Sequence, residues 1–368
     1  MRLLRITQRS AKREHLERLA NTIQLAYQKH PESVLKEARS RYPSNTRFIV
    51  LPMDLRGMNL GTPPQDILQQ HKQLAELAQK KEYQDIVIPF IHIDPRSLQC
   101  GGPDPIAFIK EFHRRGFRGI KLYPPLGYAP RCESVLPIYE YANKHGLPVM
   151  VHCSFGGVRA RGLKDEEILN IMAPHQYRAI LTRFPNMKLC LAHFGGNKAW
   201  DAYLKDPWPM EPKQIKPDRS LFKKLGNRIK NLRCVCEGKN ELEFDLEMSL
   251  KNDDNLSNDN IEQMNWLSQI LTMIRSNAYP NLYTDISYTI FRFHELVSIL
   301  KVFLVDEAVR THTLFGSDYY MSDMAGFSER ELSIRLRAEL GEDYFWQIAE
   351  TNPAVFLGEK TGSSPNGG

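Results

Sequence analysis

Histidine and aspartate residues stand at the carboxyl ends of three apolar runs in this sequence. His152 and His193 each close such a run, and Asp318 follows a third. Neutral imidazoles and a carboxylate are the ligands that zinc and similar divalent ions prefer, and three of them leave a position for a water molecule. Each residue alone also fits a structural role, as a rim histidine or a helix-capping aspartate. Their equivalent places after three runs favour a metal or catalytic site.

The runs belong to a regular alternation of strands and helices. Stretches with helical periodicity lie between them, at residues 65–80, 105–115 and 136–145, and again at 261–277. Seven near-continuous apolar runs spaced in this way predict parallel strands covered on both faces, in an α/β fold. No G-x-G-x-x-G follows the first run, which favours a TIM-type (β/α)8 barrel over a dinucleotide-binding sheet. The runs are residues 47–53, 85–93, 118–123, 147–152, 187–193, 282–287 and 313–317.

Barrel active sites lie at the carboxyl ends of the strands, and other polar residues reach this end. Lys121 could hold a substrate carboxylate, bridge two metal ions if it is carboxylated, or point to solvent. His92 could reach the pocket or lie in the core or rim, whereas His312 begins its run and is expected to be structural. The remaining candidates for lining the substrate pocket are Arg96, Tyr123, Ser154 and Asp285, the last with Ser287 beside it.

The chain is predicted to form one domain over residues 1–357. A segment of about 197–280 interrupts the alternation and includes the polar tract 251–260, so we interpret it as an insertion over one end of the barrel. Residues 358–368 are small and polar and are expected to be a disordered tail.

Composition limits the compartment and the partners. The net charge of +6 is spread along 368 residues, and no stretch of about 18 apolar residues occurs, so we expect neither nucleic-acid nor membrane binding. Six cysteines in a chain of this length do not form a disulfide framework, and Cys234-x-Cys236 lacks a second ligand pair. The expected setting is the reducing cytoplasm. The expected partner is a small-molecule substrate, and the insertion offers a surface for a homodimer.

The runs resemble the amidohydrolase-related family of the metal-dependent amidohydrolase superfamily, in the branch of aminocarboxymuconate-semialdehyde decarboxylase. The resemblance covers about 47–357 and is carried by residues 116–122, 148–152, 191–196, 281–287, 315–319 and 352–357. It implies a divalent ion, zinc or alternatively manganese, held by His152 and Asp318, with Asp318 also taking the proton of the attacking water. His193 would bind a second metal ion or act as the acid/base.

One departure from the family pattern is clear. Members carry His-x-His at the end of the first strand, and this sequence has none there. The seven runs then correspond to strands two to eight, so the first strand is missing or atypical, either because Met1 is internal to a longer gene or because the metal site is lost. The predicted function is a metal-dependent hydrolase of a C–N or ester bond. The alternatives are a non-oxidative decarboxylase of the same fold and an inactive barrel or truncated fragment that serves as a binding protein.

Overall fold

A computed structural model describes most of the chain. The described residues are 30–54, 56, 65–157, 159–160, 162–205, 261–289, 293–319 and 329–359. Residues 360–368 of the predicted tail, the polar tract 251–260 and Cys234-x-Cys236 lie outside them, whereas Gly358 and Glu359 are described. In these ranges no helix is both long and apolar enough to cross a membrane.

All the described strands run parallel, and each of the seven predicted runs contains one strand except 85–93, which contains two. Hydrogen bonds join β1 to β2 in one sheet. In a second sheet each strand from β3 to β8 is bonded to the next one along the chain. The strands are β1 (Phe48–Val50), β2 (Val87–Pro89), β3 (Ile91–His92), β4 (Ile120–Leu122), β5 (Val149–Ser154), β6 (Leu189–Gly195), β7 (Leu282–Asp285) and β8 (Thr313–Leu314).

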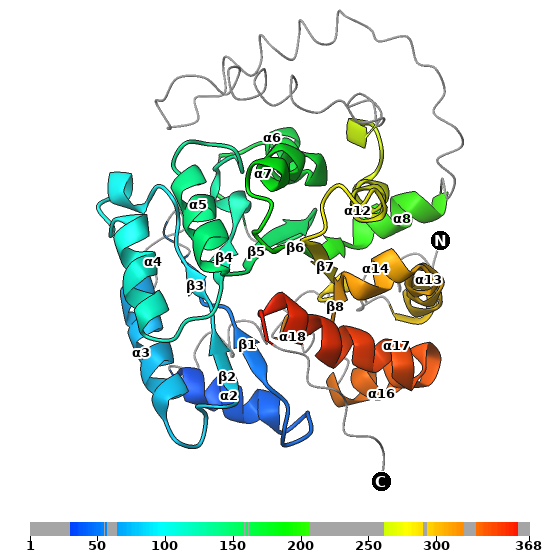
Figure 1. Cartoon of the computed structure of the whole chain (residues 1–368), viewed down its shortest axis with the longest axis horizontal. Helices are drawn as coiled ribbons and strands as arrows, with labels where there is room; N and C mark the ends of the chain where they lie inside the picture. Colours follow the sequence, from blue (N-terminus) through cyan, green and yellow to red (C-terminus); the bar gives the residue numbers. More distant parts are fainter. Residues whose placement is uncertain are drawn as a thin grey trace, which may run out of the picture.

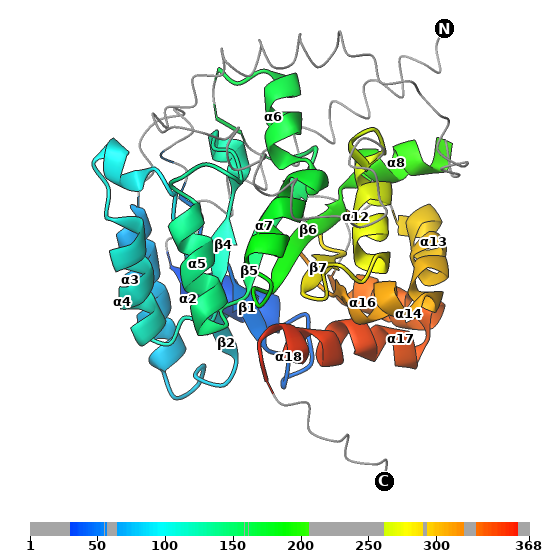
Figure 2. The same ribbon diagram turned by 45° about the horizontal axis from the view of Figure 1, so that its top comes forward.

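Strands β2 and β3 are two halves of one run that meet at Phe90. The amide of Phe90 still donates to the carbonyl of Val50, while the amide of Ile91 donates to the carbonyl of Gly119. The run therefore changes partner at Phe90, from β1 on one side to β4 on the other. Consecutive strands are joined through helices that cover the outer face, as Figures 1 and 2 show, so the fold is the predicted α/β barrel.

The helices begin where short polar side chains can accept from free backbone amides. Asp66, Asp104 and Asn265 each accept from an amide three residues later, and Gly146 ends α5 in the left-handed conformation. The α-helices are α2 (Pro31–Arg39), α3 (Ile67–Gln79), α4 (Pro105–Arg114), α5 (Leu136–His145), α6 (Asp165–Met172), α7 (Arg178–Arg183), α8 (Asn197–Lys205), α12 (Trp266–Arg275), α13 (Phe293–Val305), α14 (Glu307–Thr311), α16 (Glu329–Leu340), α17 (Glu342–Trp346) and α18 (Asn352–Phe356).

The described ends of the predicted insertion are part of the barrel's helical layer. Helix α8 contacts β6, and α12 contacts both β6 and β7. Trp200 and Leu267 from these helices are buried in the main core. The segment at 197–280 therefore begins and ends with helices that cover the sheet.

A separate apolar cluster fills the inside of the barrel. The ring of Phe90 packs against Gly119, where a Cβ atom would overlap it. Phe356 and Leu357, from α18 and the residue after it, join this cluster from below. The strands contribute Ile49, Leu51, Ile88, Phe90, Met150, Cys190, Ala192, Tyr283 and Leu314. Side chains from opposite strands meet in one cluster, so the strands surround a packed interior, although no hydrogen bonds join β8 to β1 among the described residues.

An ion-pair network holds Glu359, which follows α18, against the amino ends of the strands. Glu359 accepts from both Nη atoms of Arg47, at 2.8 and 2.6 Å, and from Nη1 of Arg118 at 2.7 Å. Arg47 directly precedes β1, and Arg118 lies two residues before β4. The hydrogen bonds from Arg47 and Arg118 lower the pKa of Glu359 to about 2. The carboxylate therefore ties the residues that follow α18 to the amino ends of β1 and β4.

Replacing Glu359→Gln should lower the free energy of unfolding by about 1 kcal/mol at neutral pH, since the carboxylate bridges two guanidinium groups. The folded pKa is depressed, so this contribution is present above the ordinary pKa near 4.5 and fades as pH falls towards 2. Urea unfolding at pH 7 and at stepwise lower pH measures the difference. Glu331→Gln, in the exposed pair with Arg335, is the control and should cost less. A constant difference down to pH 2.5 would contradict the bridge.

Candidate functional site

Towards the carboxyl ends of the strands, the side chains inside the barrel are polar. Strand register aligns His92 with Lys121, Lys121 with Met150, and Met150 with Cys190. Met150 and Cys190 belong to the interior cluster. Aligned residues of parallel strands share a face, so His92 and Lys121 also point inside. Two residues further along β5, His152 points inside as well.

His152 and His193 contact each other directly. Nε2 of His193 lies 3.0 Å from Nδ1 of His152, and the ring centroids are 4.7 Å apart. Nε2 of His152 lies 2.9 Å from the carbonyl oxygen of Gly156. Because a carbonyl only accepts, this nitrogen of His152 carries a proton and Nδ1 accepts from His193. Burial, the neighbouring His193 and Lys121 hold the pKa of His152 well below its usual range, which keeps the ring neutral.

Asp285 supports His193 from behind. Its carboxylate accepts from the amide of His193 at 3.0 Å, the amide of Ser287 at 2.9 Å and the thiol of Cys190 at 3.5 Å. The hydroxyl of Ser287 also donates to it and lies 2.9 Å from Nδ1 of His193. These four residues are buried, and an unpaired carboxylate would be costly here. Asp285 is therefore the anchor of the site.

The donors and acceptors of this network show where its protons lie. The single proton of the Ser287 hydroxyl goes to Asp285, so Nδ1 of His193 must donate to Ser287. Nε2 of His193 also donates, because Nδ1 of His152 accepts. Every contact is thus satisfied when Nδ1 of His193 donates to Ser287 and one further proton lies between Nε2 of His193 and Nδ1 of His152. The arrangement stores one transferable proton.

A left-handed turn brings His193 into this position. Residues 193–196 have successive φ values of 71°, 47°, 80° and 74°. The His193 and Phe194 positions are strained, at about 1–2 kcal/mol each for an L-residue, and Gly195 and Gly196 follow without that cost. The carbonyl of His193 accepts from the amide of Gly196 at 2.7 Å and from the Thr289 hydroxyl. The turn explains the His-Phe-Gly-Gly sequence.

Gly196→Ala should lower the free energy of unfolding by about 3 kcal/mol, because the new Cβ would be strained at φ +74° and would overlap Ser154. Gly116→Ala is a matched control. Gly116 also has a positive φ, of +93°, but its Cβ would meet nothing within 4 Å, so only about 1–2 kcal/mol should be lost. Urea unfolding measures both. Equal losses would show that contact with Ser154 is unimportant, and Ser154→Gly should partly restore the Gly196→Ala variant.

Lys121 is a buried cation. Lys121 is only 5% exposed, and its ammonium group has no hydrogen bond or ion pair with any of the described residues. Burial lowers its pKa, and the carboxylates of Asp285 and Asp318 oppose that effect from across the barrel. A buried cation without a close partner fits the predicted role of binding a carboxylate.

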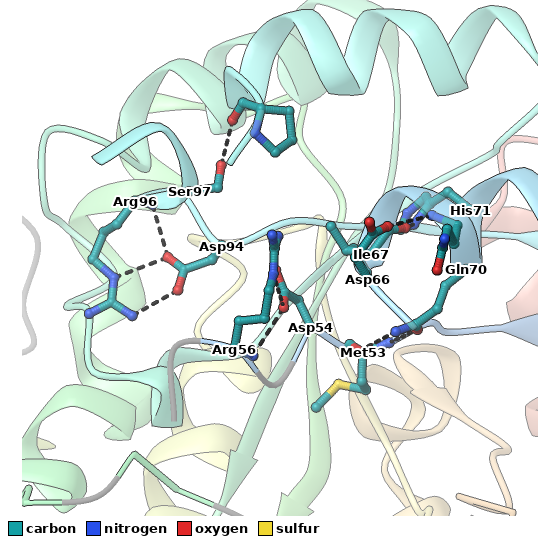
Figure 3. A network of polar contacts seen from close by, with 12 residues as sticks. Met53, Asp54, Arg56, Asp66, Ile67, Gln70, His71, Asp94, Arg96 and Ser97 are labelled. Carbon is teal, nitrogen blue, oxygen red and sulfur yellow. Dashed lines mark hydrogen bonds and ion pairs between the residues drawn. The ribbon is translucent and has the colours of Figure 1, made fainter. Parts of the chain in front are cut away.

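Two Asp-x-Arg motifs stand at the ends of neighbouring strands, and the first was not anticipated from the sequence. Arg56 binds Asp54 through Nε and Nη2, at 3.0 and 2.8 Å, after β1. Arg96 binds Asp94 at the same distances after β3 (Figure 3). The repeated spacing was the available signal.

Arg96 has further partners that define its position. Its Nη atoms also donate to the carbonyls of Gly127 and Leu126, at 3.0 and 2.8 Å. These carbonyls belong to the 3₁₀ turn after β4, at Pro124–Leu126, and to the residue that ends it. Arg96 therefore braces this loop, and its predicted contact with substrate would require these bonds to be exchanged.

The other predicted residues surround His152 or lie further out. The Tyr123 ring is 4.7 Å from the His152 ring, between centroids. The Ser154 hydroxyl accepts from the amide of Gly156 at 3.1 Å and so shapes the loop over His152. Asp318 is exposed, has a φ of 55°, and acts electrostatically on Lys121. The structure thus brings His152, His193 and Asp285 together and leaves Asp318 at the mouth.

The described residues do not fit a metal ion as they lie. Both nitrogens of His152 are engaged, one by His193 and the other by Gly156. No three His, Cys, Asp or Glu side chains in the described ranges are close enough together to hold an ion. The zinc or manganese site stays a prediction, which elemental analysis of the purified protein checks. A cavity of about 560 Å³, lined by Arg47 and Arg118, lies at the amino end of the barrel, away from this site.

Comparison with family models identifies one match. Residues 69–220 match the amidohydrolase family. The resemblance read from the sequence is confirmed over this stretch, which includes Lys121, His152 and His193. This is a family of metal-dependent enzymes. Comparison with curated proteins gives no match.

Several solved structures are similar at low sequence identity. A probable 2-pyrone-4,6-dicarboxylic acid hydrolase from Acinetobacter baumannii is 11% identical, with a TM-score of 0.47 over 89% of this chain and 86% of that one. A 2,6-dihydroxybenzoate decarboxylase from Rhizobium is 13% identical, with a TM-score of 0.47 over 90% and 88%. A 5-carboxyvanillate decarboxylase from Novosphingobium aromaticivorans, complexed with manganese, is 13% identical, with a TM-score of 0.46 over 85% and 76%.

Proposed function

We propose that the chain is an amidohydrolase-type enzyme that hydrolyses a C–N or ester bond of a small carboxylate at the carboxyl end of the barrel. The observation that carries the proposal is the buried network of Asp285, Ser287, His193 and His152, which holds one transferable proton. Proton transfer to or from a reacting group is the chemistry that such a network supplies.

Each residue has a distinct part in the proposed reaction. Asp285 accepts from the backbone amide of His193 and holds the Ser287 hydroxyl, which in turn positions the His193 ring. His193 passes its proton to Nδ1 of His152, and Nε2 of His152 gives its own proton to the substrate. The carbonyl of Gly156 now occupies that nitrogen, so the loop at 155–157 must move when substrate binds.

Lys121 is the proposed anchor for the substrate carboxylate. In hydrolysis, water adds to the carbonyl carbon, the C–N or C–O bond breaks, and the leaving atom takes the proton from His152. The proton of the attacking water goes to a base, for which Asp318 at the mouth is the proposed residue.

Decarboxylation is the second candidate, and Lys121 favours it because a buried cation orients a carboxylate. The C–C bond would break, carbon dioxide would leave, and the carbon would take the proton from His152. Dicarboxylate lactones, hydroxybenzoates and N-acyl amino acids, assayed for acid, amine and carbon dioxide release, separate the two reactions. Absence of turnover across this panel, with the fold intact, would favour the inactive barrel.

His193→Gln should lower kcat by about 10²–10⁴-fold on the best substrate of that panel, because the stored proton is lost. Ser287→Ala should cost less, because Asp285 still binds the amide of His193. His312→Gln is the control, since His312 lies at the amino end of β8 and should leave kcat unchanged. Full activity of His193→Gln would refute the network as the catalytic device.

Lys121→Met should raise KM by at least about tenfold for a carboxylate substrate, since a charge-assisted hydrogen bond is lost. KM for the methyl ester of the same substrate should change little, because no charge remains to be bound. Steady-state kinetics on the acid and ester pair measure both values. An equal rise for both compounds would place Lys121 in a structural role.

A further inference from the structure

His92 presents a buried nitrogen with no partner. Its Nδ1 lies 3.0 Å from the carbonyl of Lys121, so that nitrogen carries the proton and Nε2 is a bare lone pair. Nε2 is buried and has no hydrogen-bond partner among the described residues. Burial lowers the pKa of His92 to about 4, so the ring stays neutral near pH 7. Buried polar atoms are nearly always paired, so a donor is expected at this nitrogen.

The His92 ring is held by the carbonyl of Lys121, and the backbone that carries it is held by His71. The backbone amide of His92 donates to Nε2 of His71 at 3.0 Å, and Nδ1 of His71 then donates to the carbonyl of Ile67 at 2.8 Å. The His71 ring is stacked on Phe117, at 5.3 Å between centroids. The orientation of Nε2 is therefore set by the fold, and it does not depend on a ligand.

Charged groups of both signs act on the His92 ring. The carboxylates of Asp54 and Asp94 raise the pKa of His92, and the ammonium of Lys121 lowers it. Asp54 is already occupied by Arg56, through the fork shown in Figure 3. Lys121 is aligned with His92 and has no close partner among the described residues. An acceptor and a free cation thus stand side by side on the interior face.

Three kinds of partner could bind the lone pair of Nε2 of His92. A metal ion would need further ligands, and no group of three ligating side chains occurs in the described ranges. A buried water would need two to four polar partners. A substrate whose carboxylate is held at Lys121 could bring an O–H or N–H donor to Nε2 of His92. The donor would have to stand on the carbon next to the carboxylate.

We infer that His92 and Lys121 together select carboxylates that carry an O–H or N–H group on the carbon next to the carboxylate. This inference rests on the proposed function, because it uses Lys121 as the carboxylate anchor. The ammonium of Lys121 takes the carboxylate, and Nε2 of His92 accepts from the hydroxyl or amide beside it. For a C–N hydrolase, N-acyl amino acids have this pattern, since the N–H of the scissile amide is next to the carboxylate.

Calorimetric titration of the full chain with three matched compounds tests the inference. Mandelate carries the hydroxyl donor, O-methylmandelate keeps the oxygen without the proton, and phenylacetate lacks both. Mandelate should bind on the order of tenfold more tightly than the other two, which corresponds to one hydrogen bond to a buried acceptor. His92→Asn should abolish this preference while phenylacetate binding is kept, since the asparagine amide still reaches the Lys121 carbonyl and ends short of the Nε2 position.

Controls separate this inference from the proposed function. His312→Asn replaces a histidine at the other end of the barrel and should keep the preference for mandelate. Lys121→Met should weaken the binding of all three compounds. If the three bind equally to the unmodified protein, or if His92→Asn keeps the preference, His92 is paired with water and the inference is overturned while the carboxylate anchor stands. If none of the three binds, the anchor at Lys121 and the inference fail together. A folded His92→Phe variant that loses the preference would support it independently.

Discussion

The buried carboxylate of Asp285 is the group on which the site depends. It stands at the end of β7 and binds the backbone of β6 through the amide of His193, and it also binds Ser287 in its own loop. A buried carboxylate must be paired to be tolerated, so these contacts are required as soon as the barrel closes around it. In meeting that requirement, the chain fixes the direction of the His193 side chain.

The strained turn at residues 193–196 is a consequence of the same constraint. An L-residue in the left-handed region costs about 1–2 kcal/mol, and two such residues precede the glycines. The Asp285 carboxylate and the Thr289 hydroxyl hold the amide and carbonyl of His193, so hydrogen bonds offset the strain. In return, the imidazole of His193 reaches back to His152 on β5. Strain of this kind is typical of functional sites, where the surrounding fold determines the backbone.

The two halves of the barrel mouth carry different chemistry. Strands β5 to β7 hold the proton network, while β3 and β4 present a fixed acceptor at His92 beside the ammonium of Lys121. The Asp-x-Arg forks after β1 and β3 neutralise their own charges, and this leaves Lys121 as the cation available to a ligand among these groups. A substrate lying across the mouth would meet recognition on one side and proton transfer on the other.

The sequence by itself determined the parallel α/β architecture and the residues at the strand ends. Alternating apolar runs and capped helices require it, because each run must be buried on both faces. His152 and Lys121 could be found for the same reason, since side-chain alternation along a strand places them inside the barrel, whereas the left-handed turn brings His193 there.

Only the tertiary structure decided which of these residues touch. His152 and His193 lie within their strands, whereas Asp318 follows its strand and lies exposed at the mouth, because the direction of a side chain after a strand depends on loop backbone angles that composition does not specify. The predicted substrate contact of Arg96 is likewise replaced by bonds to Asp94 and to the loop after β4. The free nitrogen of His92 depends on where the carbonyl of Lys121 and the ring of His71 lie. Hydrogen-bond partners from separate strands are set by register and packing, which no local pattern records.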